Sequence, residues 1–172
     1  MALLGSHFIG RPFDQKILLA KIQTIFDSRN NLQKYFLDNI TLKENHTNIS
    51  LNDKEFLDNC IKIIEANLNN QDFNAQLLAT LCHMSYSNLY KKIRGISQLT
   101  ISSFIRTIRL RKAAVLMLST ENTINEIAYA VGVHDIKYFR EKFKEIYGLT
   151  PSGYIKKYRS QFKQSYNLRE KG

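Results

Sequence analysis

The chain has 172 residues, of which 44% are hydrophobic, which is enough for one globular domain and a fragment of another. Its net charge of +10 is uneven: residues 1–84 carry 8 Lys and Arg against 9 Asp and Glu, and residues 85–172 carry 17 against 6. This surplus favours a polyanionic partner such as nucleic acid, although a basic protein can also be no more than soluble. Because no apolar run approaches the roughly 18 residues of a membrane span and no signal peptide is recognisable, we expect a cytoplasmic protein.

Cysteine and histidine give no signal for a metal or a catalytic site. Cys60 and Cys82 are too far apart for a CxxC motif and too few for a disulfide framework, so we expect two small buried side chains in a reducing cytoplasm. The histidines show no ligand spacing, and the adjacency of Cys82 and His83 is a weak signal for zinc. Without a glycine-rich phosphate loop or a G-x-S-x-G motif, the chain is expected to be no enzyme and to hold no metal or cofactor.

Residues 1–36 predict the end of a strand followed by a long helix. The segment Phe8-Ile9-Gly10-Arg11-Pro12-Phe13 resembles the end of a response-regulator receiver domain, where a strand closes with a Lys-Pro dipeptide before the last helix. Arg11 stands in place of that lysine. The resemblance implies that the phosphoacceptor aspartate lies upstream, so this chain cannot itself accept a phosphoryl group. An ordinary amphipathic helix is the alternative, since apolar residues recur at helical spacing at Ile17, Leu18, Ile22, Ile25 and Phe26.

Residues 37–53 are polar and irregular, and we interpret them as a linker whose few apolar residues can dock as an extended segment. Asn52 or Asp53 is expected to cap the next helix, which should end within residues 69–72. The apolar stripe of this helix is Phe56, Leu57, Cys60, Ile61, Ile64 and Leu68.

A segment of two helices joined by a turn follows. It comprises a short helix that Asn74 caps, a turn over 82–84, and a second helix over 86–94 that Ser85 caps and Gly95 stops. The second helix is expected to bury Leu89 and Ile93 and to expose Ser87, Asn88, Lys91 and Lys92, with Tyr86 and Tyr90 alongside.

A long helix is predicted from Thr100 to about Leu118. With ~18 residues at 1.5 Å per residue it would be about 27 Å long, enough to hold two reading modules at a fixed separation. Its middle is basic, with Arg106, Arg109, Arg111 and Lys112.

The second segment opens at Thr123-Ile124-Asn125-Glu126, which has the pattern of a capping box. Gly132 stands where the chain must turn with a positive φ, whereas His83 has this position in the first segment, at some backbone cost. Asp135 is expected to cap the second helix of this segment.

The last helices have clear end signals. Tyr147-Gly148 should end one helix, and Thr150-Pro151 should start the next, with threonine as the cap and proline in the first position. The tail after Phe162 is polar and basic, and we expect it to fray.

The two segments repeat at a nearly fixed distance. Ala79 and Ala128 are 49 residues apart, whereas Leu89 and Phe139 are 50 apart, so the second segment has one extra residue in its turn. A short helix, a tight turn and a second helix with polar and basic residues, present twice, predict a duplicated helix-turn-helix.

Residues in both segments and in the long helix carry a resemblance to a known family. They are Leu78-Ala79, His83-Met84-Ser85, Ser87-Asn88-Leu89-Tyr90, Phe104-Ile105-Arg106, Arg109-Leu110, Ile124-Asn125-Glu126-Ile127-Ala128, Val131-Gly132-Val133, Tyr138-Phe139, Phe143-Lys144 and Tyr147-Gly148-Leu149-Thr150-Pro151-Ser152. This set resembles the AraC/XylS family of bacterial transcription regulators over about residues 56–159. The resemblance implies an all-α fold of about seven helices, with two helix-turn-helix subdomains joined by a long linker helix, preceded here by the N-terminal helix.

The resemblance also implies an organisation into domains. With the receiver-like N-terminus, the chain resembles the C-terminal output part of a hybrid two-component regulator, and a separate receiver–AraC response regulator is the close competitor. The expected parts are a receiver remnant (1–36), a linker (37–53), a double helix-turn-helix DNA-binding domain (54–160) and a basic tail (161–172).

The second helix of each helix-turn-helix is expected to enter a major groove, the two grooves being about 34 Å apart on one face of the DNA. Asn88 could pair with adenine, Lys91 and Lys137 with guanine, and Ile136 with a thymine methyl group, although a phosphate contact is at least as common for each. Glu141 stands where the family often has a basic residue, and it either reads cytosine, pairs with a neighbour or faces away. The candidate DNA-binding residues are Tyr86, Ser87, Asn88, Tyr90, Lys91, Ile136, Lys137, Tyr138, Arg140 and Lys144.

The expected partner is double-stranded promoter DNA, with RNA polymerase as a further candidate and a homodimer expected for the full-length protein. The alternative is a protein-interaction module of a signalling protein, in which the basic faces are only solvated surface. RNA binding is disfavoured because the exposed aromatic sheet or OB-type strands that it would use are not predicted.

Overall fold

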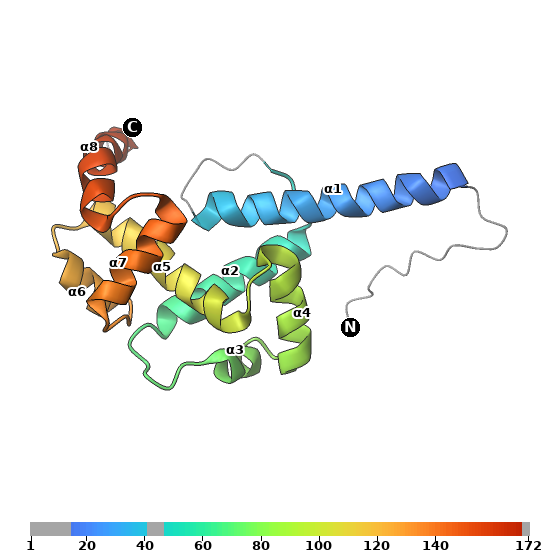
Figure 1. The fold of residues 1–172 in the computed structure, drawn as a ribbon, viewed down its shortest axis with the longest axis horizontal. Helices are drawn as coiled ribbons and strands as arrows, with labels where there is room; N and C mark the ends of the chain where they lie inside the picture. The colour runs from blue at the N-terminus through green and yellow to red at the C-terminus, as the bar shows by residue number, and fades with distance from the viewer. Residues whose placement is uncertain (1–14, 41–46, 170–172) are drawn as a thin grey trace.

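The computed structural model describes residues 15–40 and 47–169, and this part of the chain contains eight helices and no strand (Figure 1). The predicted all-α fold is therefore confirmed, and the receiver-like segment at residues 8–13 lies outside the described residues. The helices are α1 (Gln15–Ile40), α2 (Leu51–Ala66), α3 (Ala75–Leu81), α4 (Tyr86–Ser97), α5 (Ile101–Ser119), α6 (Ile124–Ala130), α7 (Ile136–Tyr147) and α8 (Pro151–Arg169).

Helix α5 is the scaffold of the fold. In Figure 1, α3 and α4 lie toward one end of α5, and α6 and α7 lie toward its other end. Its first half contributes Phe104 and Ile108 to one hydrophobic core, formed with α1 to α4. Its second half contributes Ala114 and Met117 to a second core, formed with α6 to α8. The two cores therefore share one rigid helix, which fixes their separation.

The duplication is longer than the sequence indicated. Gln98 and Gly148 both end the second helix of a helix-turn-helix in the left-handed conformation, with φ of 59° and 70°. Thr100 and Thr150, again 50 residues apart, then begin helices of 19 residues each, α5 and α8. The Thr100 hydroxyl accepts from Ser103 N–H at 3.2 Å, and the Thr150 hydroxyl accepts from Gly153 N–H at 3.2 Å. The repeated unit is thus three helices long, α3–α5 and α6–α8.

The predicted linker over 37–53 is shorter than expected, because both flanking helices extend into it. Helix α1 continues to Ile40, since Phe36 and Ile40 are only 2% exposed and pack into the first core. Helix α2 already begins at Leu51, because Ser50, rather than Asn52 or Asp53, is its N-cap and accepts from Asp53 N–H at 3.1 Å.

Three further helix ends differ from the predictions. Gly95 does not stop α4, which continues for two residues because Ile96 is buried in the first core. Helix α2 ends at Ala66, ahead of the predicted residues 69–72. The backbone of α8 stays helical past Phe162, to Arg169, where we expected fraying.

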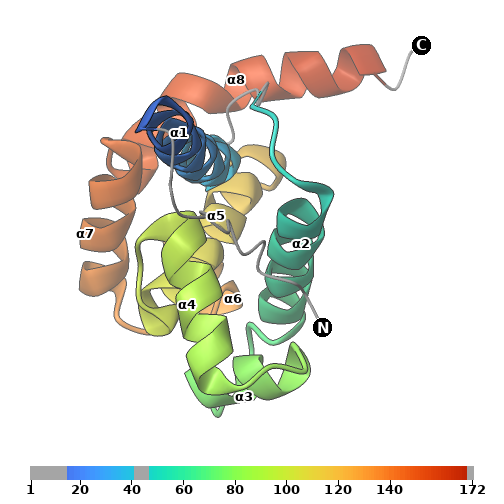
Figure 2. The ribbon, with the colours of Figure 1, turned by 90° about the vertical axis from the view of Figure 1, so that its right-hand side faces the viewer.

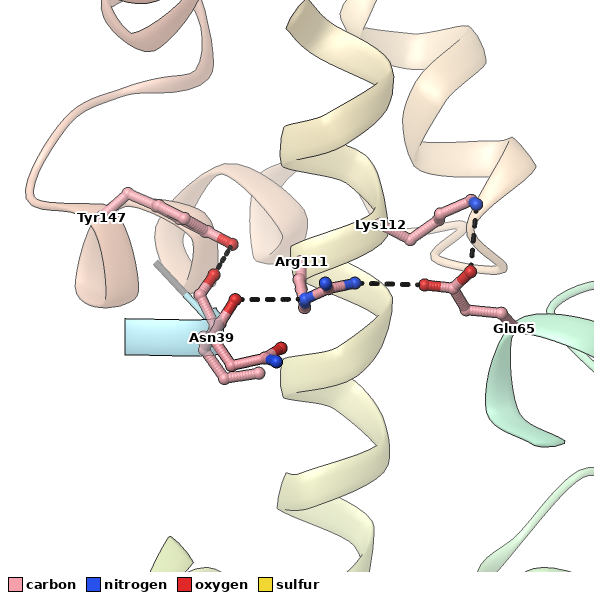
Figure 3. Close-up of polar contacts among 6 residues, drawn as sticks. Asn39, Glu65, Arg111, Lys112 and Tyr147 are labelled. Atoms are coloured by element: carbon pink, nitrogen blue, oxygen red, sulfur yellow. Dashed lines mark hydrogen bonds and ion pairs between the residues drawn. The ribbon is translucent and has the colours of Figure 1, made fainter. Parts of the chain in front are cut away.

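The C-terminal end of α1 is tied to the rest of the domain by polar contacts (Figure 3). Its last carbonyl oxygens have no partner within the helix. Tyr147 of α7 donates to the Ile40 carbonyl at 2.9 Å, and Arg111 of α5 donates to the Asn39 carbonyl at 3.1 Å. Arg111 also pairs with Glu65 of α2 at 3.4 Å, so α1, α2, α5 and α7 are joined in one network. The N-terminal part of α1 projects away from the domain (Figure 1).

Within the described ranges, no helix combines the length and the apolar character that crossing a membrane would need.

Candidate nucleic-acid interface

The turn of the first helix-turn-helix is held by three backbone hydrogen bonds. They run from Cys82 N–H to Leu78 O (2.9 Å), from His83 N–H to Thr80 O (3.0 Å) and from Met84 N–H to Ala79 O (3.0 Å). This is the Schellman pattern of helix endings, which requires a left-handed residue after the C-cap. His83 is that residue, with a φ of 54°.

The second turn repeats the same three bonds. They run from Val131 N–H to Ile127 O (3.0 Å), from Gly132 N–H to Tyr129 O (2.9 Å) and from Val133 N–H to Ala128 O (2.9 Å). Gly132 has a φ of 75°, as predicted, and a Cβ there would lie 2.2 Å from the Leu68 carbonyl oxygen. The duplication is therefore confirmed at the level of individual hydrogen bonds, and the second turn is too crowded for any residue except glycine.

The N-caps of α3, α4, α6 and α7 follow the predictions. Asn74 accepts from Gln76 N–H at 2.9 Å, Ser85 from Asn88 N–H at 3.2 Å, and Asp135 from Tyr138 N–H at 2.9 Å. The predicted capping box is also present, since the Thr123 hydroxyl accepts from Glu126 N–H and the Glu126 carboxylate accepts from Thr123 N–H at 2.7 Å. These bonds from Thr123 hold the pKa of Glu126 below its usual value. The caps fix where α4 and α7 begin.

Helix α4 exposes its five candidate residues, whereas Lys92, which was also expected to be exposed, is half-buried. Leu89 and Ile93 are fully buried, whereas the candidate residues Tyr86, Ser87, Asn88, Tyr90 and Lys91 are exposed. Lys92 belongs to another surface, because its ammonium lies 4.3 Å from the centre of the Phe56 ring of α2.

Helix α7 exposes three of its five candidates, Lys137, Arg140 and Lys144. Ile136 is half-buried and packs against the second core. Tyr138 is also half-buried, and its hydroxyl accepts a hydrogen bond from Arg106 of α5. Glu141 is exposed, and no ion pair joins it to another described residue.

The four basic residues in the middle of α5 stabilise the fold by binding other elements, a role that the sequence did not reveal. The Arg109 guanidinium donates to the Gly132 carbonyl at 2.9 Å, which ties the linker helix to the second turn. Burial lowers the pKa of Arg109 from its usual value. Arg106 binds Tyr138, Arg111 binds the end of α1, and Lys112 pairs with Glu65 at 3.0 Å. These four cations therefore hold elements together, and the candidate DNA-binding charge lies on α4 and α7.

An open cleft of about 440 Å³ lies between the two helix-turn-helix segments, α3–α4 and α6–α7, beside α5. The N-cap residues of α3 and α7, Asn74 and Asp135, both line it. Among its lining residues are Asn74, Arg106, Arg109, His134, Asp135 and Tyr138. Figure 2 shows α1 end-on. It lies above α4, near the C-terminal ends of α4 and α7.

No group of three or more metal-ligating side chains occurs in residues 15–40 and 47–169, and His7 and His46 lie outside these ranges.

Comparison with known proteins gives the fold and the type of domain. Residues 78–157 match the helix-turn-helix domain family. Histidine kinase P4 of Formosa agariphila is 31% identical over 158 residues, which are 92% of this chain and 12% of that protein. The bifunctional transcriptional activator/DNA repair enzyme AdaA of Bacillus subtilis is 27% identical over 121 residues, 70% of this chain and 56% of AdaA. This chain therefore spans only part of these relatives.

A solved structure shares the fold. A transcriptional regulator from Chromobacterium violaceum, described as containing an AraC-type DNA-binding domain, superposes with a TM-score of 0.55. The two sequences are 19% identical, and the superposition covers 66% of this chain and 96% of that one. The two-module architecture of α2–α8 is thus that of AraC-type DNA-binding domains.

Proposed function

We propose that this chain, whose double helix-turn-helix is a DNA-binding domain of the AraC type, is the sequence-specific DNA-reading part of a bacterial two-component transcription regulator. The observation that carries the proposal is the repeated turn at each end of α5, which presents the polar and basic faces of α4 and α7. A major groove admits one helix and shows a distinct donor and acceptor pattern for each base pair. Helices α4 and α7 would each enter one groove.

The two recognition helices would read different sequences. At the 50-residue offset of the two helices, Lys91 corresponds to Glu141, and Tyr90 corresponds to Arg140. A lysine in the groove favours guanine, whereas a glutamate accepts from the cytosine amino group or repels phosphate. In the proposed complex, Tyr86, Ser87, Asn88, Tyr90 and Lys91 contact one half of the site, and Ile136, Lys137, Tyr138, Arg140 and Lys144 contact the other.

The two-component role has separate support. The match to histidine kinase P4 covers 92% of this chain and so includes at least part of α1. Helix α1 enters from the N-terminal side and ends against α5 and α7 through Arg111 and Tyr147. In the proposed role, α1 passes the state of upstream domains to the DNA-binding modules. The alternative is that the full-length protein is a separate response regulator with the same output domain. The proposal also includes a homodimer of the full-length protein and a contact with RNA polymerase.

The test is binding of the purified chain to labelled duplex DNA, first to fragments that it selects from a random pool. We expect affinity to fall steeply with salt, because each neutralised phosphate releases counterions. Lys91→Ala and Lys137→Ala should each weaken binding by about 1–3 kcal/mol if these lysines read bases. Lys62→Ala changes an exposed lysine of α2 that lies outside both helix-turn-helix segments, so this variant is the matched control and should bind as the unchanged chain does.

Two results would count against the proposal. Absent or salt-insensitive binding across the pool would favour the protein-interaction module instead. Unchanged affinity in both lysine variants would remove α4 and α7 from their assigned role.

A further inference from the structure

The two cysteines, distant in sequence, are neighbours in the fold. Cys60 lies within α2, and Cys82 is the C-cap of α3, directly before the turn of the first helix-turn-helix. Their Sγ atoms are 3.8 Å apart, and both are free thiols. The chain has only these two cysteines, so neither has another partner within the molecule.

We propose that Cys60 and Cys82 are a redox-active pair that hydrogen peroxide converts into a reversible intramolecular disulfide. A disulfide has an S–S distance of about 2.05 Å, so the two sulfur atoms need to approach by roughly 1.8 Å. Because Cys82 lies at the end of a seven-residue helix, its side chain and the adjoining turn can supply this movement more easily than the middle of α2.

The two thiols have different tasks. Cys60 has no exposed surface, whereas Cys82 is half-buried and is the one that a peroxide can reach. A hydrogen bond from the Cys60 thiol lowers the pKa of Cys82, and the same bond, together with burial, raises the pKa of Cys60. Cys82 is therefore the attacking thiolate, and Cys60 is the resolving thiol.

The reaction balances with one peroxide. The Cys82 thiolate attacks one peroxide oxygen, an S–O bond forms, the O–O bond breaks, and hydroxide leaves as water after protonation. Cys82 is then a sulfenic acid. The sulfur of Cys60 attacks the sulfur of Cys82, the S–S bond forms, the S–O bond breaks, and the leaving hydroxide takes the Cys60 proton to give a second water. The two thiols lose two electrons in total, and an external dithiol restores them by exchange.

The first test uses the full chain and intact-mass spectrometry. One equivalent of hydrogen peroxide should lower the monomer mass by about 2 Da, block alkylation of both cysteines, and be reversed by dithiothreitol. Cys82→Ser should keep its mass under the same treatment, because the remaining thiol is buried. A monomer that keeps its mass, gains about 16 Da, or bridges only between chains would overturn the proposal.

The second test concerns DNA binding and rests on the proposed function. Closing the bond pulls the C-cap of α3 toward α2, and His83 and Met84 carry this shift to the start of α4. We expect the oxidised chain to bind DNA more weakly than the reduced chain, with full recovery in dithiothreitol. Equal affinities would contradict the coupling to α4, whereas absent binding by the reduced chain would contradict the proposed function itself.

Discussion

The residue at the turn of each helix-turn-helix has a positive φ, but the two modules use different side chains there. Gly132 adopts this conformation without strain, and the space around it is filled by the Leu68 carbonyl and the Arg109 guanidinium. His83 adopts nearly the same φ with a full side chain, which costs roughly 1–2 kcal/mol relative to a right-handed residue. The two turns therefore predict opposite outcomes for opposite substitutions.

His83→Gly should stabilise the first module, because glycine removes the strain of the left-handed conformation. The greater freedom of glycine in the unfolded chain offsets about 0.5–1 kcal/mol of this gain, so the net stabilisation should lie between about 0 and 1.5 kcal/mol. Chemical denaturation measures it. A loss of stability would show that the His83 side chain makes contacts worth more than the strain.

Gly132→Ala should destabilise the second module by about 1–3 kcal/mol, because the added Cβ would lie 2.2 Å from Leu68 O and 2.8 Å from an Arg109 nitrogen. Gly95→Ala is the control, since a Cβ at this helical position meets nothing within 4 Å and alanine favours helix. Equal effects of the two substitutions would contradict the crowding at Gly132.

The sequence predicts a helix boundary correctly where a single side chain decides the local conformation. Asn74, Ser85, Thr123 and Asp135 were predicted as N-caps because their side-chain oxygens have one obvious task before a helix. The end of α4 was predicted at Gly95, which is wrong, because burial of the next residue and an uncommon left-handed Gln98 decide it. Tertiary packing of this kind leaves no local signal.

At the scale of elements, the end of α1 is the feature that sequence reasoning missed. The sequence indicated a helix and then a linker, and nothing in the pattern showed that Arg111 and Tyr147, far along the chain, would bind the last carbonyl groups of α1. Burial in its apolar surroundings raises the pKa of Tyr147, which keeps its hydroxyl protonated as a donor. The basic residues of α5 were likewise visible in the sequence, but their partners were not.

Arg111→Ala should loosen the last turns of α1. The change leaves the part-buried Asn39 carbonyl without its donor, which costs about 1 kcal/mol. Faster amide hydrogen exchange at the C-terminal end of α1, with α7 and α8 unchanged, is the expected result. Lys112→Ala is the matched control, because it removes only the other partner of Glu65, and it should leave α1 protected.

On the scale of the whole molecule, two cores meet along α5, and the second is rich in aromatic rings. Phe143, Tyr147 and Tyr154 contact one another with ring centres 4.4–5.3 Å apart. Burial raises the pKa of Tyr154 to about 12, from an ordinary value of 10.0, and raises that of Tyr147 further. Folding therefore favours the neutral phenols of this core.

Alkaline unfolding should follow from these shifts. The folded pKa values lie above the unfolded value, so the contribution to stability is complete below pH 10 and is lost as the pH rises toward 12. Ultraviolet titration should show two tyrosines that ionise late and together with unfolding. Tyr154→Phe should move alkaline unfolding to higher pH, and an unchanged midpoint would contradict the role of this phenol.

The length of α5 sets a rotational phase between the two modules. One residue more in an α-helix would turn the second module by about 100° and advance it by about 1.5 Å. One extra base pair turns a DNA site by only about 35° and advances it by about 3.4 Å. In the proposed complex, no number of added base pairs would therefore match both the rotation and the advance of the second module. In the proposed complex, side chains on α5 can therefore vary as long as the cores stay filled, whereas a change in its residue count would alter the half-site spacing that α4 and α7 could read together.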